Sequence, residues 1–173
     1  MDWGSEPNIY VIGGAEGPGL ALVREILNRG AFMVGVLDGI GANTEAVDAL
    51  GDAVWSVQYD LSFSCPDIFT ESIVFHTAYS RLEDPLAGLQ SNLRMGQNIV
   101  QALTAACYLG RPPKLAAYIP STRVDLVTRM AIGWLFEHLH LSHGVDVLST
   151  ITYNLKDSVL ACAVCNLVES VVK

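Results

Sequence analysis

The chain has 173 residues, of which 51% are hydrophobic and 16% charged, and its 18 acidic and 10 basic side chains leave a net charge of −8. The apolar fraction excludes an intrinsically disordered chain, and the acidic balance argues against non-specific binding to nucleic acid, which needs a basic face. A chain of this length can bury one sizeable core, so we expect one domain.

Short apolar runs alternate with longer amphipathic segments along the chain. We expect six strands, at residues 8–13, 31–37, 53–57, 72–77, 114–120 and 144–152. We expect helices at residues 19–29, 44–50, 84–109, 124–141 and 155–172. This alternation predicts an α/β fold: a Rossmann-like, doubly wound parallel sheet of about six strands in the order 3-2-1-4-5-6, with helices on both faces. Residues 1–7 are predicted to form an N-terminal tail, and residues 8–173 a single domain.

Neither a membrane span nor a signal peptide is indicated. No uncharged apolar run reaches about 18 residues, and the N-terminus is polar and acidic. The four cysteines (Cys65, Cys107, Cys162 and Cys165) lie in apolar stretches, which predicts reduced, mostly buried thiols of a cytoplasmic protein. The C-x-x-C at residues 162–165 has no second pair to complete a zinc site, so we interpret it as helix packing.

The first predicted strand runs into a glycine-rich turn, IGGAEGPG at residues 12–19, and then into a helix. Such a turn lets the backbone approach a pyrophosphate, and the helix N-terminus supplies N–H groups and a partial positive charge. Asp38 follows the second strand, where a carboxylate can accept hydrogen bonds from a ribose diol and would favour NAD over NADP. An aspartate there can equally be a turn or helix-capping residue.

Five motifs, in this order, resemble those of the short-chain dehydrogenase/reductase family, including its epimerase/dehydratase branch. They are Gly13-x-x-x-Gly17-x-Gly19, Asp60-Leu61, Val74-Phe75-His76-Thr77-Ala78, Asp84-Pro85 with Asn92 and Asn98, and His143-Gly144-Val145-Asp146-Val147. The resemblance covers residues 8–152. It implies a dinucleotide site with NAD as the cofactor, formed by Gly13, Gly17, Gly19, Asp38, Asp60, Leu61, Thr77 and Ala78.

The residues that carry the family's proton transfer are altered. The family uses a Tyr, a Lys four residues later, a Ser that holds the substrate oxygen and an Asn on the preceding helix. Ser121 and Asn92 match the last two, whereas Asp125 and Arg129 stand where the Tyr and the Lys are expected. An ionised Asp is a poor proton donor, and an Arg stays protonated. The i, i+4 spacing of this pair is also that of a salt bridge.

The glycine turn departs from the family pattern in two further ways. Pro18 has no N–H group, which removes a donor for a pyrophosphate oxygen, although proline is also a favourable first residue of a helix. Glu16 places a carboxylate beside the expected phosphates, unless its side chain points away from them. We therefore expect NAD binding to be weakened or lost, and we expect no bound metal.

Further polar residues are predicted at the carboxyl ends of the strands: His76, Tyr79, Ser121, Arg123, Asp125, Tyr153 and Asn154. His76 could be a general base, but a structural role is favoured because its branch of the family carries a His at this place. Tyr79 could replace the lost phenol or simply pack over the sheet edge. The histidines at 138, 140 and 143 are interpreted as cations at a helix C-terminus rather than as metal ligands.

The two long helices carry apolar residues on more than one face, and a second apolar face indicates a partner. The family resemblance implies a homodimer formed through the helices at 84–109 and 124–141. Family members also usually continue past the sixth strand into a substrate-binding segment, which residues 155–173 are too short to supply. We therefore expect an open cleft, or a cleft completed by a partner subunit.

Three functions remain open at this point. The favoured one is a repurposed, non-redox enzyme of isomerase, cyclase or lyase type that acts on a small organic molecule in biosynthesis. Its candidate catalytic residues are Ser121, Asp125, Arg129, Asn92, His76 and Tyr79. The second is a non-catalytic NAD(P)-binding sensor or subunit partner. The third, an atypical NAD(P)-dependent oxidoreductase, is least favoured because both the Tyr and the Lys are missing.

Overall fold

The computed structural model describes residues 8–80, 82–121, 124–149 and 156–171. The predicted N-terminal tail at residues 1–7 lies outside the described residues, as do the candidates Arg123, Tyr153 and Asn154. Within the described part of the chain, no helix is long and apolar enough to cross a membrane.

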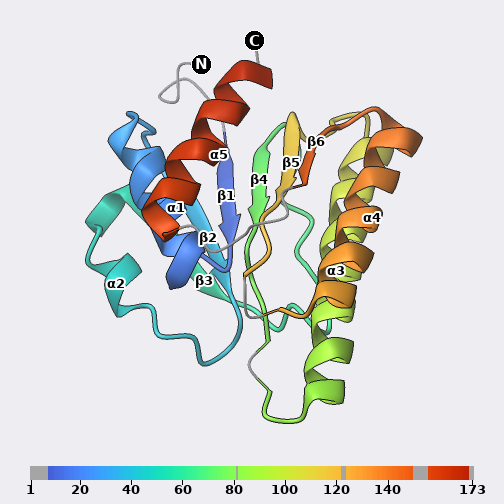
Figure 1. The fold of residues 1–173 in the computed structure, drawn as a ribbon. Helices are drawn as coiled ribbons and strands as arrows, with labels where there is room; N and C mark the ends of the chain where they lie inside the picture. Colours follow the sequence, from blue (N-terminus) through green and yellow to red (C-terminus); the bar gives the residue numbers. More distant parts are fainter. Residues whose placement is uncertain (1–7, 81, 122–123, 150–155, 172–173) are drawn as a thin grey trace.

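Six parallel strands form one sheet in the order β3-β2-β1-β4-β5-β6, which confirms the predicted fold class (Figure 1). The strands are β1 (Ile9–Ile12), β2 (Val34–Asp38), β3 (Val54–Gln58), β4 (Ile73–His76), β5 (Leu115–Tyr118) and β6 (Asp146–Ser149). The order reverses between β1 and β4, and in sheets of this kind ligands bind beyond the carboxyl ends of the strands at that point.

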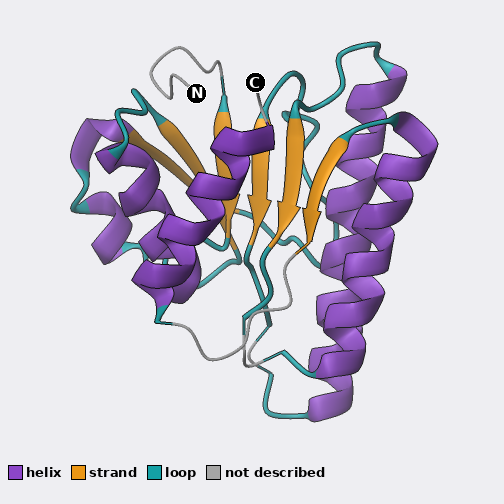
Figure 2. Ribbon diagram, turned by 45° about the horizontal axis from the view of Figure 1, so that its top comes forward, coloured by secondary structure: helices purple, strands orange, loops and turns teal. Residues whose placement is uncertain are grey.

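Helices cover both faces of the sheet, as predicted (Figure 2). One face carries α1 (Gly17–Asn28) and α5 (Asp157–Val171), which pack side by side, and the other carries α3 (Pro85–Tyr108) and α4 (Leu126–His143). A short α2 (Glu45–Asp48) and a 3-10 turn, η1 (Gly51–Ala53), join β2 to β3. The sequence pattern does not predict η1.

Both faces of the central strands are buried because successive side chains point to opposite sides. On β4, Ile73 and Phe75 belong to the core beneath α1 and α5, while Val74 belongs to the core beneath α3 and α4. All three are fully buried. The continuous apolar runs in the sequence therefore reflect two cores, one on each side of a single sheet.

Strand starts differ from the prediction where apolar residues continue beyond the hydrogen-bonded ladder. Residues 31–37 are predicted as a strand, but β2 begins at Val34, and Phe32 and Met33 are 85% and 54% exposed. Helix ends follow local signals more closely. Gly144, in the left-handed conformation with φ 67°, ends α4 and donates its N–H to His140 O at 2.8 Å.

Candidate functional site

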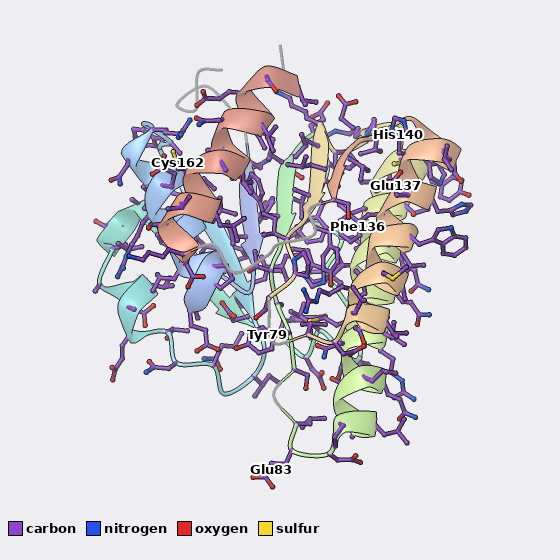
Figure 3. The ribbon with its side chains drawn as sticks, viewed as in Figure 1. Tyr79, Glu83, Phe136, Glu137, His140 and Cys162 are labelled. Atoms are coloured by element: carbon purple, nitrogen blue, oxygen red, sulfur yellow. The ribbon has the colours of Figure 1, made fainter. Side chains whose placement is uncertain are left out.

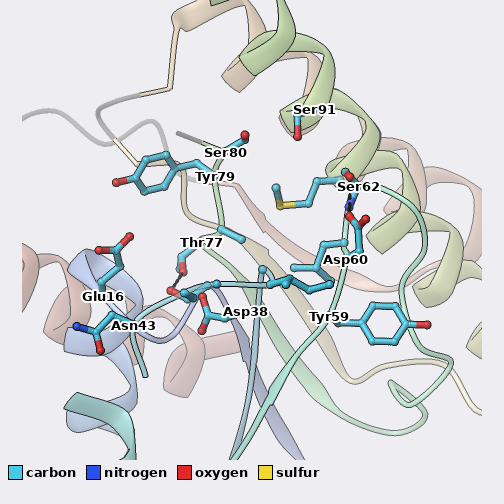
Figure 4. Close-up of a pocket in the computed structure, with 18 of the residues that line it drawn as sticks. Glu16, Asp38, Asn43, Tyr59, Asp60, Ser62, Thr77, Tyr79, Ser80 and Ser91 are labelled. Atoms are coloured by element: carbon cyan, nitrogen blue, oxygen red, sulfur yellow. Dashed lines mark hydrogen bonds between the residues drawn. The ribbon is translucent and has the colours of Figure 1, made fainter. Parts of the chain in front are cut away.

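A pocket of about 730 Å³ opens at the carboxyl ends of β1, β2, β3 and β4 (Figure 4). Loops after four strands and the helices α1 and α3 line it. The glycine turn contributes Gly13, Glu16 and Pro18, and the loops after the next three strands contribute residues 38–43, 59–62 and 77–80. Ser91 and Met95 of α3 complete the lining. The pocket thus lies at the reversal point of the strand order.

Six of the eight residues predicted to bind a dinucleotide line this pocket: Gly13, Asp38, Asp60, Leu61, Thr77 and Ala78. Gly17 and Gly19 are not among the described lining residues, and Gly19 has a packing role instead. A Cβ on Gly19 would lie 1.9 Å from Gly13 O, and a Cβ on Gly13 (φ 89°) would lie 2.4 Å from Ala78 N. Only glycine fits this close approach between the turn, α1 and the loop after β4.

Asp38, the last residue of β2, holds the glycine turn against the sheet. Its side chain is 6% exposed, and its Oδ2 accepts a hydrogen bond from Ala15 N at 2.8 Å. Burial raises the pKa of Asp38 to about 7; the Ala15 hydrogen bond opposes the rise, and the Glu16 charge adds to it. The Asp38 carboxyl group therefore lies at the pocket wall, and its protonation changes near neutral pH.

The loop after β3 is held by polar contacts of its own. Asp60 Oδ1 accepts hydrogen bonds from Ser62 N at 3.2 Å and from Ser62 Oγ at 2.6 Å. Leu61 is buried, and its carbonyl accepts a hydrogen bond from Asn98 Nδ2 of α3 at 2.9 Å. Asn98, which the sequence analysis cites only as part of a motif, thus positions one wall of the pocket.

Of the six residues proposed for catalysis, Tyr79 lines the pocket, and the other five are not among its described lining residues. Tyr79 lies beyond the end of β4 (Figure 3). Asn92 of α3 is 7% exposed, and its Oδ1 accepts a hydrogen bond from Ser80 N at 2.6 Å. This contact ties the loop that carries Tyr79 to α3.

His76 lies in the core rather than in the pocket lining. Its ring is fully buried, with centroids 5.2 Å from Tyr118 and 6.0 Å from Phe136, the latter stacked on it from α4. Neither ring nitrogen has a hydrogen-bond partner among the described residues. Burial lowers the pKa of His76 to about 3, so the ring is neutral at physiological pH. This is the geometry of a packing residue.

The segment that matches the family's catalytic helix begins α4 and does not reach the described pocket lining. Asp125 is the N-cap: its Oδ1 accepts from Thr128 N at 2.9 Å and its Oδ2 from Thr128 Oγ1 at 2.5 Å. These bonds lower the pKa of Asp125. Arg129 Nε donates to Val124 O at 2.6 Å, and Ser121, 6% exposed, accepts from Val124 N at 3.1 Å through its carbonyl.

Several lining residues were not predicted from the sequence: Ile40, Asn43, Tyr59, Ser80, Ser91 and Met95. Ser91 and Met95 are one helical turn apart on α3 and flank Asn92 in sequence, so helical spacing from that motif residue was the available signal. Ile40 and Asn43 carry no motif. Their place in the lining follows from the path of the loop after β2.

The described lining of the pocket offers hydrogen-bond acceptors and apolar surface. Asp38, Asp60 and the apolar Leu61 offer acceptors and an apolar wall suited to a ribose and a base. At the start of α1 the lining consists of Glu16 and Pro18, and no Lys or Arg belongs to the described lining. Within the described residues, no group of three His, Cys, Asp or Glu side chains is placed to hold a metal ion.

The fold is the Rossmann-like fold of short-chain dehydrogenases/reductases, which UDP-galactose 4-epimerase shares. By sequence, no protein-family description and no curated protein matches the chain. Among solved structures, the chain is similar to the Bordetella bronchiseptica enzyme WbmF in complex with NAD+ and UDP, with 20% identity and a TM-score of 0.67 over 86% of this chain and 50% of WbmF.

Two other solved structures show the same likeness. A protein assigned to the short-chain dehydrogenases/reductases of Corynebacterium glutamicum is 18% identical, with a TM-score of 0.69 over 94% of this chain and 92% of that one. A UDP-galactose 4-epimerase is 18% identical, with a TM-score of 0.63 over 83% of this chain and 55% of that one. The chain thus spans about half the length of WbmF and the epimerase, but nearly the full length of the Corynebacterium protein.

Proposed function

We propose that this chain is a degenerate member of the short-chain dehydrogenase/reductase family that binds a nucleoside-containing small molecule in the pocket at the carboxyl edge of its sheet. One observation carries the proposal. The glycine turn and the ends of β2, β3 and β4 bring Asp38, Asp60 and Thr77 to the wall of one pocket. In doubly wound sheets this is the place where nucleotides bind.

The proposed function does not include hydride transfer through a Tyr/Lys pair. Asp125 and Arg129 stand at the positions that the family resemblance assigns to that pair. Asp125 accepts two hydrogen bonds from Thr128 as the cap of α4, and Arg129 donates to the backbone of Val124. Both side chains therefore have structural contacts that favour a role in starting the helix. NAD, if it binds, binds weakly because Glu16 and Pro18 line the start of α1.

Titration calorimetry with NAD+, NADH, NADP+, NADPH, adenosine and AMP tests the binding proposal. We expect at least one of these compounds to bind at a single site. The Asp38→Asn variant keeps an acceptor for Ala15 N but removes the charge, and it should weaken ribose recognition about fivefold. Glu137→Gln, an exposed change on α4, is the control. Absence of binding by all six compounds would contradict the proposal.

A second candidate function is a non-redox reaction of isomerase, cyclase or lyase type. It is favoured by Tyr79, Ser80 and Ser91, whose hydroxyl-bearing side chains line the pocket beyond Ala78. Proton NMR of a ligand incubated with the protein would detect conversion without added cofactor. If Tyr79 donates the proton, Tyr79→Phe should slow conversion at least tenfold while changing the Kd little. An unchanged rate in this variant would remove Tyr79 from the mechanism.

We also propose that the chain forms a homodimer, chiefly through α4. An exposed apolar stripe on that helix contains Val127, Met130 and Trp134, which are 69%, 63% and 66% exposed. The exposed side of α3 carries polar residues along its middle, namely Gln90, Arg94, Gln97 and Gln101, and its exposed apolar residues Leu86 and Tyr108 lie at its two ends. All four cysteines are free, which supports a cytoplasmic location as part of the same proposal.

A further inference from the structure

The loop after β3 brings Asp60, Leu61 and Ser62 to the pocket lining. Asp60 and Ser62 bond to each other at the pocket wall, through the N–H and the hydroxyl that Ser62 donates to Asp60 Oδ1 (Figure 4). Between them, the carbonyl of Leu61 accepts a hydrogen bond from Asn98 Nδ2 at 2.9 Å. The first contacts shape the turn locally, whereas the Asn98 contact joins the turn to α3, 37 residues away in the chain.

The Asn98 amide is the main polar link between this turn and the rest of the described protein. Among the described residues, the Leu61 carbonyl accepts no other hydrogen bond, and α3 sends no other side-chain hydrogen bond to the turn. Leu61 is 2% exposed, so the loss of this donor would leave its carbonyl without a partner in a buried place. The turn would then be free to shift relative to α3.

The position of the turn matters because two of its groups face the proposed ligand. Asp60 uses Oδ1 for Ser62, and within the described part of the chain its Oδ2 accepts no hydrogen bond, so Oδ2 can accept one from a ligand. Leu61 adds apolar surface, as does Met95 of α3. Met95 lies three residues before Asn98, on the same side of the helix. One side of α3 therefore supplies both a part of the wall and the anchor of the adjoining turn.

We propose that Asn98 is a positioning residue for the ligand, and that it sets the selectivity of the pocket for the base of a nucleoside. By holding the Leu61 carbonyl, its amide fixes the turn so that Asp60 Oδ2 meets an amino group on a base that rests on Leu61. This inference rests on the proposed function. It adds a residue that is not among the described lining residues and acts through the turn rather than by touching the ligand.

An isosteric substitution tests the anchor. Asn98→Asp keeps the shape of the side chain but replaces the donor that faces the Leu61 carbonyl with an acceptor. In titration calorimetry at pH 7.5 we expect the Kd for adenosine to rise about tenfold. Gln97→Glu makes the same change from amide to carboxylate at the neighbouring, exposed position of α3 and should leave the Kd unchanged.

A comparison of two ligands separates positioning from a general structural role. Purine riboside is adenosine without the 6-amino group, so it cannot donate that hydrogen bond to Asp60. We expect the wild type to bind adenosine about tenfold more tightly than purine riboside. In Asn98→Asp this ratio should fall to less than about threefold. If Asn98 only stabilised the fold, both affinities would decrease together and the ratio would not change.

A measurement on the wild type avoids dependence on the folding of the variant. In NMR, the side-chain amide resonances of Asn98 should shift saturably as adenosine is added, with the same Kd as the backbone amides of Leu61 and Ser62. Purine riboside should shift them less. If the Leu61 and Ser62 amides shift while those of the Asn98 side chain stay in place, the anchor does not respond to the ligand and the inference is overturned.

The outcomes distinguish this inference from the proposed function. If the wild type binds neither nucleoside, the proposed function fails and the inference fails with it. If the wild type binds adenosine, the pocket keeps its proposed function, and the inference is overturned by any of three results. These are an unchanged adenosine Kd in Asn98→Asp, an unchanged ratio of the two affinities in that variant, and a ratio near one in the wild type.

Discussion

At the scale of single residues, burial determines the protonation of His76, a candidate catalytic residue, and of Asp38, a predicted cofactor-binding residue. His76 is neutral because its ring is enclosed by Tyr118 and Phe136, and the pKa of Asp38 is raised because its carboxyl lies beneath the glycine turn. A motif identifies His76, and its place after a strand identifies Asp38, but neither signal indicates how deeply the side chain is buried. Their position could therefore be predicted, while the environment that decides their chemistry could not.

The buried ring of His76 makes the protein sensitive to acid. Its pKa is lowered from 6.5 to about 3, so between these values the unfolded chain binds a proton that the folded chain does not. Above pH 6.5 the His76 ring is neutral in both states and does not affect the free energy of unfolding. As the pH falls below 6.5, the free energy of unfolding decreases, and at pH 5 the decrease due to His76 is about 2 kcal/mol.

Substituting His76→Phe should remove this acid sensitivity. Urea unfolding gives the free energy of unfolding at pH 8 and at pH 5. Its decrease between the two pH values should be smaller in His76→Phe than in the wild type by about 2 kcal/mol. His138→Gln, at an exposed position on α4, is the control. An identical decrease in His76→Phe and wild type would contradict the assignment of His76 as a neutral core residue.

At the scale of elements, Asp125 is interpreted as the cap of α4. Asp125→Ala removes the acceptor for Thr128 N and leaves the buried Thr128 hydroxyl without this partner. We expect a loss of about 1–2 kcal/mol in the free energy of unfolding. Asp125→Ser keeps a capping oxygen and should lose less than half as much. Equal losses in the two variants would argue against the capping role.

The contact between α3 and α4 depends on Gly96. A Cβ there would lie 2.9 Å from Ile132 Cγ1, whereas a Cβ on Gly88 of the same helix would meet nothing closer than Leu82 O at 3.7 Å. Thermal unfolding should show that Gly96→Ala destabilises the protein by about 1–2 kcal/mol. Gly88→Ala should stabilise it by about 0.5–1 kcal/mol through helix propensity. Stabilisation by both variants would mean that the helices are not closely packed at Gly96.

Elements were predictable to different degrees. The helix ends follow Asp84, Asp125 and Gly144, which act through neighbouring residues and can therefore be recognised in the sequence. The start of β2 depends on where pairing with β1 and β3 begins, which is a long-range property. Apolar residues outside the ladder, such as Phe32 and Met33, therefore extended the predicted strand beyond its observed start.

At the scale of the whole molecule, the sheet order was predictable because the alternation of strands and helices leaves few right-handed arrangements. The side of the pocket formed by the ends of β1 to β4 was also predictable, since its residues sit at the ends of successive strands. The placement of the residues predicted for catalysis after β5 was not. Whether Ser121 and Asp125 reach the pocket depends on the path of the chain between β5 and α4, and their described contacts are with Val124 and Thr128.

The proposed homodimer gives a prediction at this scale. Light scattering coupled to size-exclusion chromatography should give twice the chain mass of 18.6 kDa for the wild type. Trp134→Glu places a charge in the apolar stripe of α4 and should yield a monomer. Trp55→Glu, on the edge strand β3, is the matched control because Trp55 is also exposed but lies outside the stripe. A monomeric wild type would contradict the dimer.

The central claim is that the chain binds a nucleoside in the pocket at the carboxyl ends of β1–β4, and an adenosine titration followed by amide chemical shifts in NMR tests it most directly. The account predicts saturable shifts at the amides of lining residues, above all Gly13, Asp38, Asp60 and Ala78. Saturable shifts confined to the start of α4, or no shifts at any adenosine concentration, would contradict it.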